Sequence, residues 1–129
     1  IPALKHLKQA VIVKYKNHKW IYGLDKRKLM CRAEYSSLNT LIQSAGALLV
    51  KAGTILLNQE LTSAGLVWGK DYRMVLHVHD EMQFVVHKDK VEKFKKIAFT
   101  IFEKTQKFFD FKCPLAGEIK VGQNWSDTH

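Results

Sequence analysis

The tripeptide His79-Asp80-Glu81 is the part of the sequence whose residue types best suggest chemistry. It lies between two runs that we expect to be β-strands, residues 73–78 and 82–87, and so forms the tip of a predicted hairpin. Tight hairpin turns favour Asn-Gly or Gly-rich pairs, because their central residues need positive φ angles. An imidazole followed by two carboxylates serves no such need, whereas carboxylate oxygens suit Mg²⁺ or Mn²⁺. The pattern indicates acid groups held at the rim of a sheet; the alternative is an exposed acidic turn that includes a histidine.

Histidines around the same tip permit a second hypothesis. His77 and His79 alternate along the first predicted strand, and His87 follows further along the hairpin. Together with Asp80 they could bind Zn²⁺ in a hydrolase or a structural site. Three histidines on one hairpin can equally arise by coincidence.

The composition limits the class of protein and of partner. The chain has 129 residues, enough for one domain or for a piece of a larger protein. A hydrophobic fraction of 47% excludes a disordered tail, and a net charge of +9 favours a polyanionic partner. Nucleic acid is the first such partner and an anionic membrane surface the second, while a merely soluble basic protein is the alternative.

The ends and the cysteines of the sequence bear on its compartment. Cys31 and Cys113 are too few and too isolated for a disulfide framework, so we expect both to be reduced in an intracellular chain. The first residues lack the apolar region and cleavage site of a signal peptide, and they lack an initiator Met. These features predict a cytoplasmic protein and an excised segment.

Helices and one further hairpin are expected before the acidic tip. Hydrophobic residues recur at helical spacing in residues 3–16, although the β-branched residues 11–13 could instead form a strand. Residues 20–23 and 28–32 predict a hairpin with a basic loop. Residues 36–62 form the longest helix, apolar nearly all round, which is typical of a helix buried in a larger protein or of a membrane span. Polar side chains interrupt this run and favour the buried helix: Asn39, Gln43, Ser44 and Lys51.

A second long helix and a final strand are expected after the tip. Asp89 and Glu92 match an N-cap and its acidic N3 partner. The helix that follows has lysine-rich outer faces, typical of a solvated surface, and an apolar inner face formed by Val91, Phe94, Ala98, Ile101, Thr105 and Phe108. After Pro114, residues 115–121 alternate as a strand. The predicted fold class is α+β: one domain, residues 1–129, with a small antiparallel sheet and two long helices packed on it.

Four segments taken together resemble the family A DNA polymerases, which include bacterial DNA polymerase I and the replicative polymerases of short-tailed bacteriophages. They are WIYGLDKRK at residues 20–28, LNTLIQSAGA at 38–47, VHDE at 78–81 and GQNW at 122–125. The resemblance runs along the whole chain, and the phage branch is the more similar. It implies the C-terminal part of a polymerase palm, without the upstream palm, fingers and exonuclease parts, that is inactive alone.

The resemblance implies roles in two-metal nucleotidyl transfer for the acidic tip. Asp80 would bind Mg²⁺, with Mn²⁺ as an alternative, and Glu81 would bind the metal directly or through water. His79 would contact the primer terminus, or else be a turn histidine bonded to the backbone. A second metal-binding aspartate and the triphosphate-binding helix lie upstream in family members, so we do not expect the metal to stay bound to this chain.

The resemblance also implies a DNA interface on the long helix and the basic loop. Asn39 and Gln43 are one helical turn apart and would donate to the minor groove at the primer–template end, or else serve as capping or buried polar residues. Sequence-independent phosphate contacts would come from Lys26, Arg27, Lys28 and Arg32. The implied partners are primer–template DNA, deoxynucleoside triphosphates and the remainder of the polymerase chain, with no membrane. Tyr35 departs from the bacterial members, which carry an arginine there, and a stand-alone DNA-binding module is the alternative function.

Overall fold

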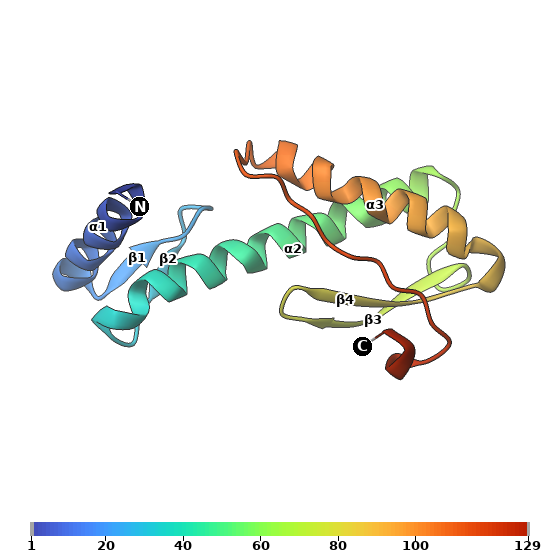
Figure 1. Ribbon diagram of the computed structural model, residues 1–129, viewed down its shortest axis with the longest axis horizontal. Coiled ribbons are helices and arrows are strands. Elements are labelled where there is room, and N and C mark those ends of the chain that lie inside the picture. Colours follow the sequence, from blue (N-terminus) through green and yellow to red (C-terminus); the bar gives the residue numbers. More distant parts are fainter. Residues whose placement is uncertain (1, 129) are drawn as a thin grey trace. The chain divides into compact units, whose positions relative to one another are not determined.

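The computed structural model describes residues 2–128 and combines α-helices with two antiparallel hairpins (Figure 1). The chain divides into two compact units, Ile1–Leu49 and Val50–His129. The longest helix, α2 (Ser37–Ser63), contributes residues to both units.

The first unit contains the predicted N-terminal helix and the predicted basic hairpin. Helix α1 (Pro2–His18) includes the β-branched residues 11–13, so the helical interpretation is confirmed. The helix ends at His18; the next residue, Lys19, has a φ of 62° that turns the chain, and its N–H donates to the Tyr15 carbonyl at 2.7 Å. Strands β1 (Trp20–Tyr22) and β2 (Lys28–Met30) then pair antiparallel. A 3₁₀ turn, η1 (Glu34–Ser36), leads into α2.

The second unit packs two helices against the hairpin that carries the acidic tip. Strands β3 (Tyr72–Val78) and β4 (Glu81–Val86) pair antiparallel, and the 3₁₀ turn η2 (Lys88–Lys90) precedes helix α3 (Val91–Phe108). The core joins α2, the connection that follows it, β3 and α3 through Leu57, Leu61, Leu66, Tyr72, Phe94 and Ile101. The fold class is therefore α+β as predicted, with two small antiparallel sheets of two strands each.

Three local predictions after the tip are wrong. Residues 115–121 form no strand, because the extended chain there pairs with no strand edge in the described residues. Asp89 is not the N-cap of α3, because Lys90 takes that position and the Asp89 N–H donates to His87 Nδ1 at 3.4 Å. Phe108 is 67% exposed because it ends α3 beyond Thr105, the last buried side chain of that helix.

Helix α2 is less covered than a core helix usually is. Residues Glu34–Ser63 are long and apolar enough to cross a membrane, a test that core helices of globular proteins also pass, and 11% of their most apolar stretch is buried. Ile42 and Ile55 are 55% and 60% exposed. Apolar side chains thus remain on the surface of both halves of the helix.

Candidate active site and nucleic-acid interface

The acidic tip is a tight turn whose first residue has an unusual backbone conformation. The strand pairing extends to Val78 and Glu81, so His79 and Asp80 alone form the turn and Glu81 begins β4. His79 has a φ of 52°, a region that side chains other than glycine seldom adopt, although histidine tolerates it better than most. Such a conformation costs on the order of 1–3 kcal/mol and occurs preferentially at functional sites. The turn therefore keeps a histidine where glycine would be less strained.

The two carboxylates of the tip differ in their surroundings. Asp80 is exposed, whereas Glu81 is half-buried and its Oε1 accepts a hydrogen bond from Gln83 Nε2. Both offer the hard oxygen ligands that Mg²⁺ prefers. In the described part of the chain, no group of three or more His, Cys, Asp or Glu side chains could hold a metal ion. The tip therefore offers two oxygen-bearing side chains that suit Mg²⁺, without a third His, Cys, Asp or Glu beside them in the described residues.

The structure does not gather the residues of the zinc hypothesis into a site. His87 follows the last residue of β4, and a strand rises about 3.3 Å per residue. His87 is therefore remote from Asp80 at the tip, and its Nδ1 lies 3.6 Å from Asp89 Oδ2 instead. The four residues proposed for zinc do not form a metal-binding group in the described chain.

The base of the hairpin is fixed to both helices while its tip stays exposed. Tyr72, at the start of β3, is 2% exposed, and its hydroxyl donates to Asn58 Oδ1 on α2 at 2.7 Å. Nearer the tip, Thr54 Oγ1 donates to the sulfur of Met82 at 2.9 Å. The ring of Phe84 lies 5.1 Å from that of Phe94 on α3. These contacts hold β3 and β4 on the helices and present His79 and Asp80 to solvent.

Asn39 and Gln43 share one exposed face at the start of α2. Both side chains are exposed, and their spacing places them one turn apart. Just before them, the buried Ser37 donates from Oγ to the Glu34 carbonyl at 2.6 Å, which fixes the first turn. Gly46 continues the same face, and a Cβ built there would meet nothing within 4 Å. Sequence reasoning gave Gly46 no role, although glycine inside a helix costs about 1 kcal/mol relative to alanine and is a signal of close approach.

The basic loop between β1 and β2 presents its cations unequally. The Arg27 guanidinium binds the Asp25 carboxylate. Although burial, the largest single influence, raises the pKa of Asp25, the hydrogen bonds and charge of Arg27 together hold that pKa below its usual range. Lys28 lies against an aromatic ring, with Nζ 4.8 Å from the centroid of Trp20. Lys26 sits at the loop tip with a φ of 63° and, like Arg32, is exposed. Lys26 and Arg32 are thus best placed for phosphate contact.

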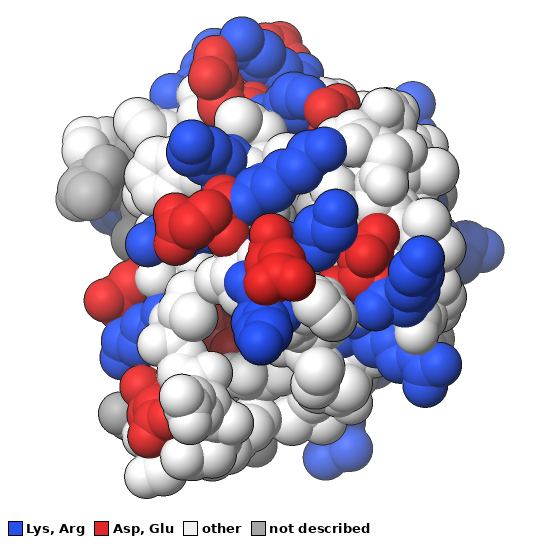
Figure 2. Space-filling view, turned by 90° about the vertical axis from the view of Figure 1, so that its right-hand side faces the viewer, with Lys and Arg blue, Asp and Glu red and all other residues white. Residues whose placement is uncertain are grey.

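The lysines of α3 form a mixed surface with neighbouring acids. Lys104 pairs with Glu60 at 2.5 Å, and Lys107 pairs with Glu103 at 2.5 Å. Figure 2 shows Lys and Arg side chains interspersed with Asp and Glu on the face that it draws. This arrangement agrees with the predicted solvated surface.

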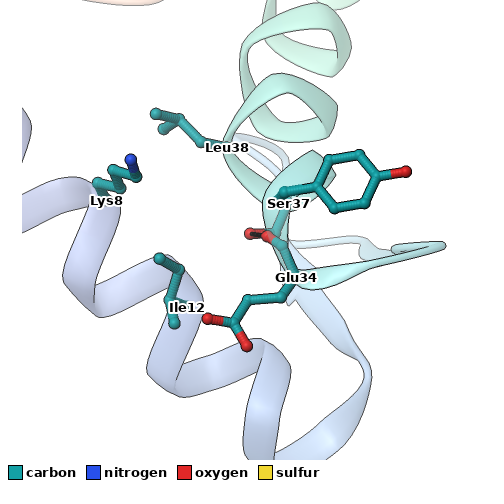
Figure 3. A pocket seen from close by; sticks show the side chains of 6 residues that line it. Lys8, Ile12, Glu34, Ser37 and Leu38 are labelled. Atoms are coloured by element: carbon teal, nitrogen blue, oxygen red, sulfur yellow. Dashed lines mark hydrogen bonds between the residues drawn. The ribbon is translucent and has the colours of Figure 1, made fainter.

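Two hollows in the surface are lined by residues other than those predicted for catalysis or DNA binding. One, drawn in Figure 3, lies between α1 and the start of α2 and is lined by Lys8, Ile12, Glu34, Tyr35, Ser37 and Leu38. Its carboxylate, on Glu34, pairs with Lys16 at 3.5 Å, and Tyr35 is 90% exposed. Another, largely apolar, lies between α2 and the β3–β4 hairpin. Neither hollow contains a residue predicted for catalysis or DNA binding.

Known proteins match almost the whole chain. The model of DNA polymerase family A matches residues 6–127. The DNA-directed DNA polymerases of Enterobacteria phage T3 and Escherichia phage T7 are each 36% identical over 126 residues, which cover 91% of this chain and 17% of the relative. DNA polymerase I of Deinococcus radiodurans is 30% identical over 116 residues, covering 88% of this chain and 11% of the relative.

A solved structure shares the fold. It is the POL domain of Pol1 from M. smegmatis, in complex with DNA primer-template and dNTP, with a TM-score of 0.77 and 20% identity. The match covers 96% of this chain and 23% of that one. The chain therefore spans less than a quarter of the length of each of these proteins.

Proposed function

The chain belongs to DNA polymerase family A, and we propose that residues 1–129 form the C-terminal part of the palm of a DNA-directed DNA polymerase. The observation that carries the proposal is the family match over residues 6–127 together with a paired-carboxylate hairpin tip inside it. Because the chain spans 17% of its phage relatives, polymerisation would belong to a larger protein. The compartment we propose is the cytoplasm of a bacterial or phage-infected cell.

Asp80 is the residue that would hold a divalent metal ion, with Glu81 beside it. Asp80 is exposed at the turn, and two adjacent carboxylates repel each other unless a cation lies near them. Bound Mg²⁺ supplies charge neutralisation and Lewis-acid polarisation in phosphoryl-type transfer. Glu81 already accepts a hydrogen bond from Gln83, so its contribution through a water molecule or through the local field fits better than direct binding.

His79 would position the primer terminus. Its strained turn conformation projects an imidazole beside Asp80 at the exposed end of the hairpin. Either ring nitrogen can donate a hydrogen bond to a sugar or phosphate oxygen. Correct placement of the attacking hydroxyl accounts for a large part of the rate in such reactions.

The exposed face of α2 would contact the minor groove of primer–template DNA. Asn39 and Gln43 supply amide donors, and every Watson–Crick pair has minor-groove acceptors at similar positions. Gly46, which leaves open space on the same face, would let the groove approach the helix closely. Lys26 and Arg32 would bind phosphates, with weaker contributions from Arg27 and Lys28, which are engaged by Asp25 and Trp20.

The DNA interface can be tested on the 129-residue chain itself. We expect weak binding to primer–template duplex that falls with salt and shows no sequence preference, because a net charge of +9 releases counterions. Replacing Lys26, Arg27 and Lys28 with serine should flatten the salt slope by up to about 2.7. A matched control removes three exposed lysines around α3, Lys88, Lys95 and Lys96. Fluorescence anisotropy at several salt concentrations measures the salt slope of the loop variant and of the control variant. Binding that is independent of salt would contradict the proposal.

The catalytic assignment needs the complete polymerase chain. We expect the 129-residue chain alone to incorporate no nucleotide, because its described residues hold no complete metal-binding group. In the complete enzyme, Asp80→Asn keeps the side-chain shape and removes the charge, so single-turnover incorporation should fall by orders of magnitude while DNA affinity stays nearly constant. Asp89→Asn, an exposed acid after β4, is the control. Normal turnover by Asp80→Asn would remove the metal assignment.

The alternative, a stand-alone module that binds DNA without chemistry, makes a different prediction. It requires the same salt-dependent binding but no incorporation in any longer chain that contains these residues. Asp80-dependent incorporation by the complete chain would therefore exclude it.

A further inference from the structure

Three aromatic side chains follow one another where α1 ends and β1 runs, the two elements labelled at the start of the chain in Figure 1. The rings of His18 and Trp20 are stacked, with centroids 5.2 Å apart and planes at 26°. The rings of Trp20 and Tyr22 meet edge to face at 4.8 Å. Strand alternation places Trp20 and Tyr22 on one face, while Ile21 between them is 2% exposed on the other. The packing of β1 therefore rests on Ile21, whereas Tyr22 and His18 are exposed and Trp20 between them is half-buried.

Two lysines lie directly against this row. Lys14 Nζ is 4.3 Å from the ring centroid of Trp20 and 5.0 Å from that of Tyr22. Lys28 Nζ, from the neighbouring strand, is 4.8 Å from the Trp20 centroid. Cation–π contacts at exposed positions are weak, so the ammonium groups can leave the rings for a stronger partner. The surface thus combines flat apolar faces with mobile positive charge.

We propose that the aromatic row, His18, Trp20 and Tyr22, binds single-stranded DNA by base stacking. Proteins that bind unpaired strands without sequence preference combine aromatic platforms with cations that follow the phosphates. A base stacking on Trp20 displaces the ammonium group of Lys14 or Lys28, and its flexible stem then lets that charge reach a flanking phosphate. The exposed Tyr22, 51% accessible, accepts the next base.

Charge complementarity selects nucleic acid over an apolar partner for this surface. The chain carries 21 Lys and Arg against 12 Asp and Glu. Asp25, the acid in the adjacent loop, is already neutralised by Arg27. The inference rests on the proposed function for its class of ligand and deepens it: α2 would contact paired bases, whereas the aromatic row would hold the unpaired strand.

The test that needs no mutation compares oligonucleotides of equal charge. Fluorescence anisotropy measures the binding of the 129-residue chain to labelled oligothymidylate and to an abasic strand of the same length, at low and at moderate salt. Stacking predicts at least about fivefold tighter binding of the oligothymidylate, with the same salt slope for both strands, because the phosphates are unchanged. Equal affinity for the two strands, or no binding of either, overturns the proposal.

Variants then assign the stacking to this row. Tyr22→Leu and Trp20→Leu should each weaken oligothymidylate binding by about fivefold to 150-fold, corresponding to about 1–3 kcal/mol per base, and leave abasic binding unchanged. Trp68→Leu removes a ring of the second unit whose exposure, 54%, is comparable to the 51% of Tyr22, and it serves as the matched control. An equal loss with Trp68→Leu overturns the assignment. Duplex binding that does not change in the Lys26 and Arg27 variants, while discrimination between the two single strands stays intact, contradicts the proposed function alone.

Discussion

Leu61 lies at the centre of the core of the second unit, and shortening it is expected to destabilise that unit strongly. Its side chain is fully buried, at 0% exposure, among a cluster that includes Leu57, Tyr72 and Phe94. Leu61→Ala removes three carbon atoms, and at about 0.8 kcal/mol each the transfer term alone is about 2.4 kcal/mol. The contacts that cannot close around the cavity raise the total to about 3–4 kcal/mol.

Urea unfolding followed by far-UV circular dichroism measures this change in the free energy of unfolding. Ile55→Ala, on the same helix at 60% exposure, is the matched control and should change stability by less than about 0.5 kcal/mol, because it removes little buried area. Leu61→Met keeps the volume and should cost less than about 1.5 kcal/mol, so it stays measurable if the alanine variant fails to fold. Equal effects of Leu61→Ala and Ile55→Ala would refute the assignment of the core.

Three further outcomes follow from single contacts. Tyr72→Phe removes the hydroxyl that donates to Asn58 and should cost about 0.5–1.5 kcal/mol in urea unfolding, with no further loss when Asn58→Ala is added. Thr105→Val replaces a buried hydroxyl that has no hydrogen-bond partner among residues 2–128, and it should raise the unfolding free energy by about 1 kcal/mol; destabilisation would contradict this. The side-chain hydrogen bond and the charge of Lys107 lower the pKa of Glu103 in the folded chain. The ion pair therefore stabilises the fold above the unfolded pKa near 4.5. This contribution is lost as the pH falls through the lowered folded pKa. The titration of Glu103 lies roughly between pH 6 and pH 3. Over this range the thermal midpoint of the Glu103→Gln variant should therefore fall less than that of the unchanged chain.

The local periodicity of the sequence was sufficient for most helices and both hairpins. Amphipathic or apolar repeats of 3.6 residues extend over α1, α2 and α3, and the β-branched runs around residues 79–80 read directly as strands. Local pattern failed where an element needs a distant partner. Residues 115–121 alternate like a strand, yet no strand edge in the described residues pairs with them. A strand exists only through hydrogen bonds to another strand, which alternation within one segment does not supply.

The chemistry of the candidate site was readable from the sequence because it depends on residue types at short spacing. His79, Asp80 and Glu81 are neighbours in the chain, and Asn39 and Gln43 share a helix face by periodicity alone. The sequence did not reveal the positive φ of His79 or the ion pair between Asp25 and Arg27. It also did not reveal that the ammonium groups of Lys14 and Lys28 both lie over the ring of Trp20. These features follow from the turn geometry, from a loop closed on itself, and from the meeting of a helix with a strand. Residue order specifies which groups are present; only the tertiary contacts decide which of them are occupied, exposed or strained.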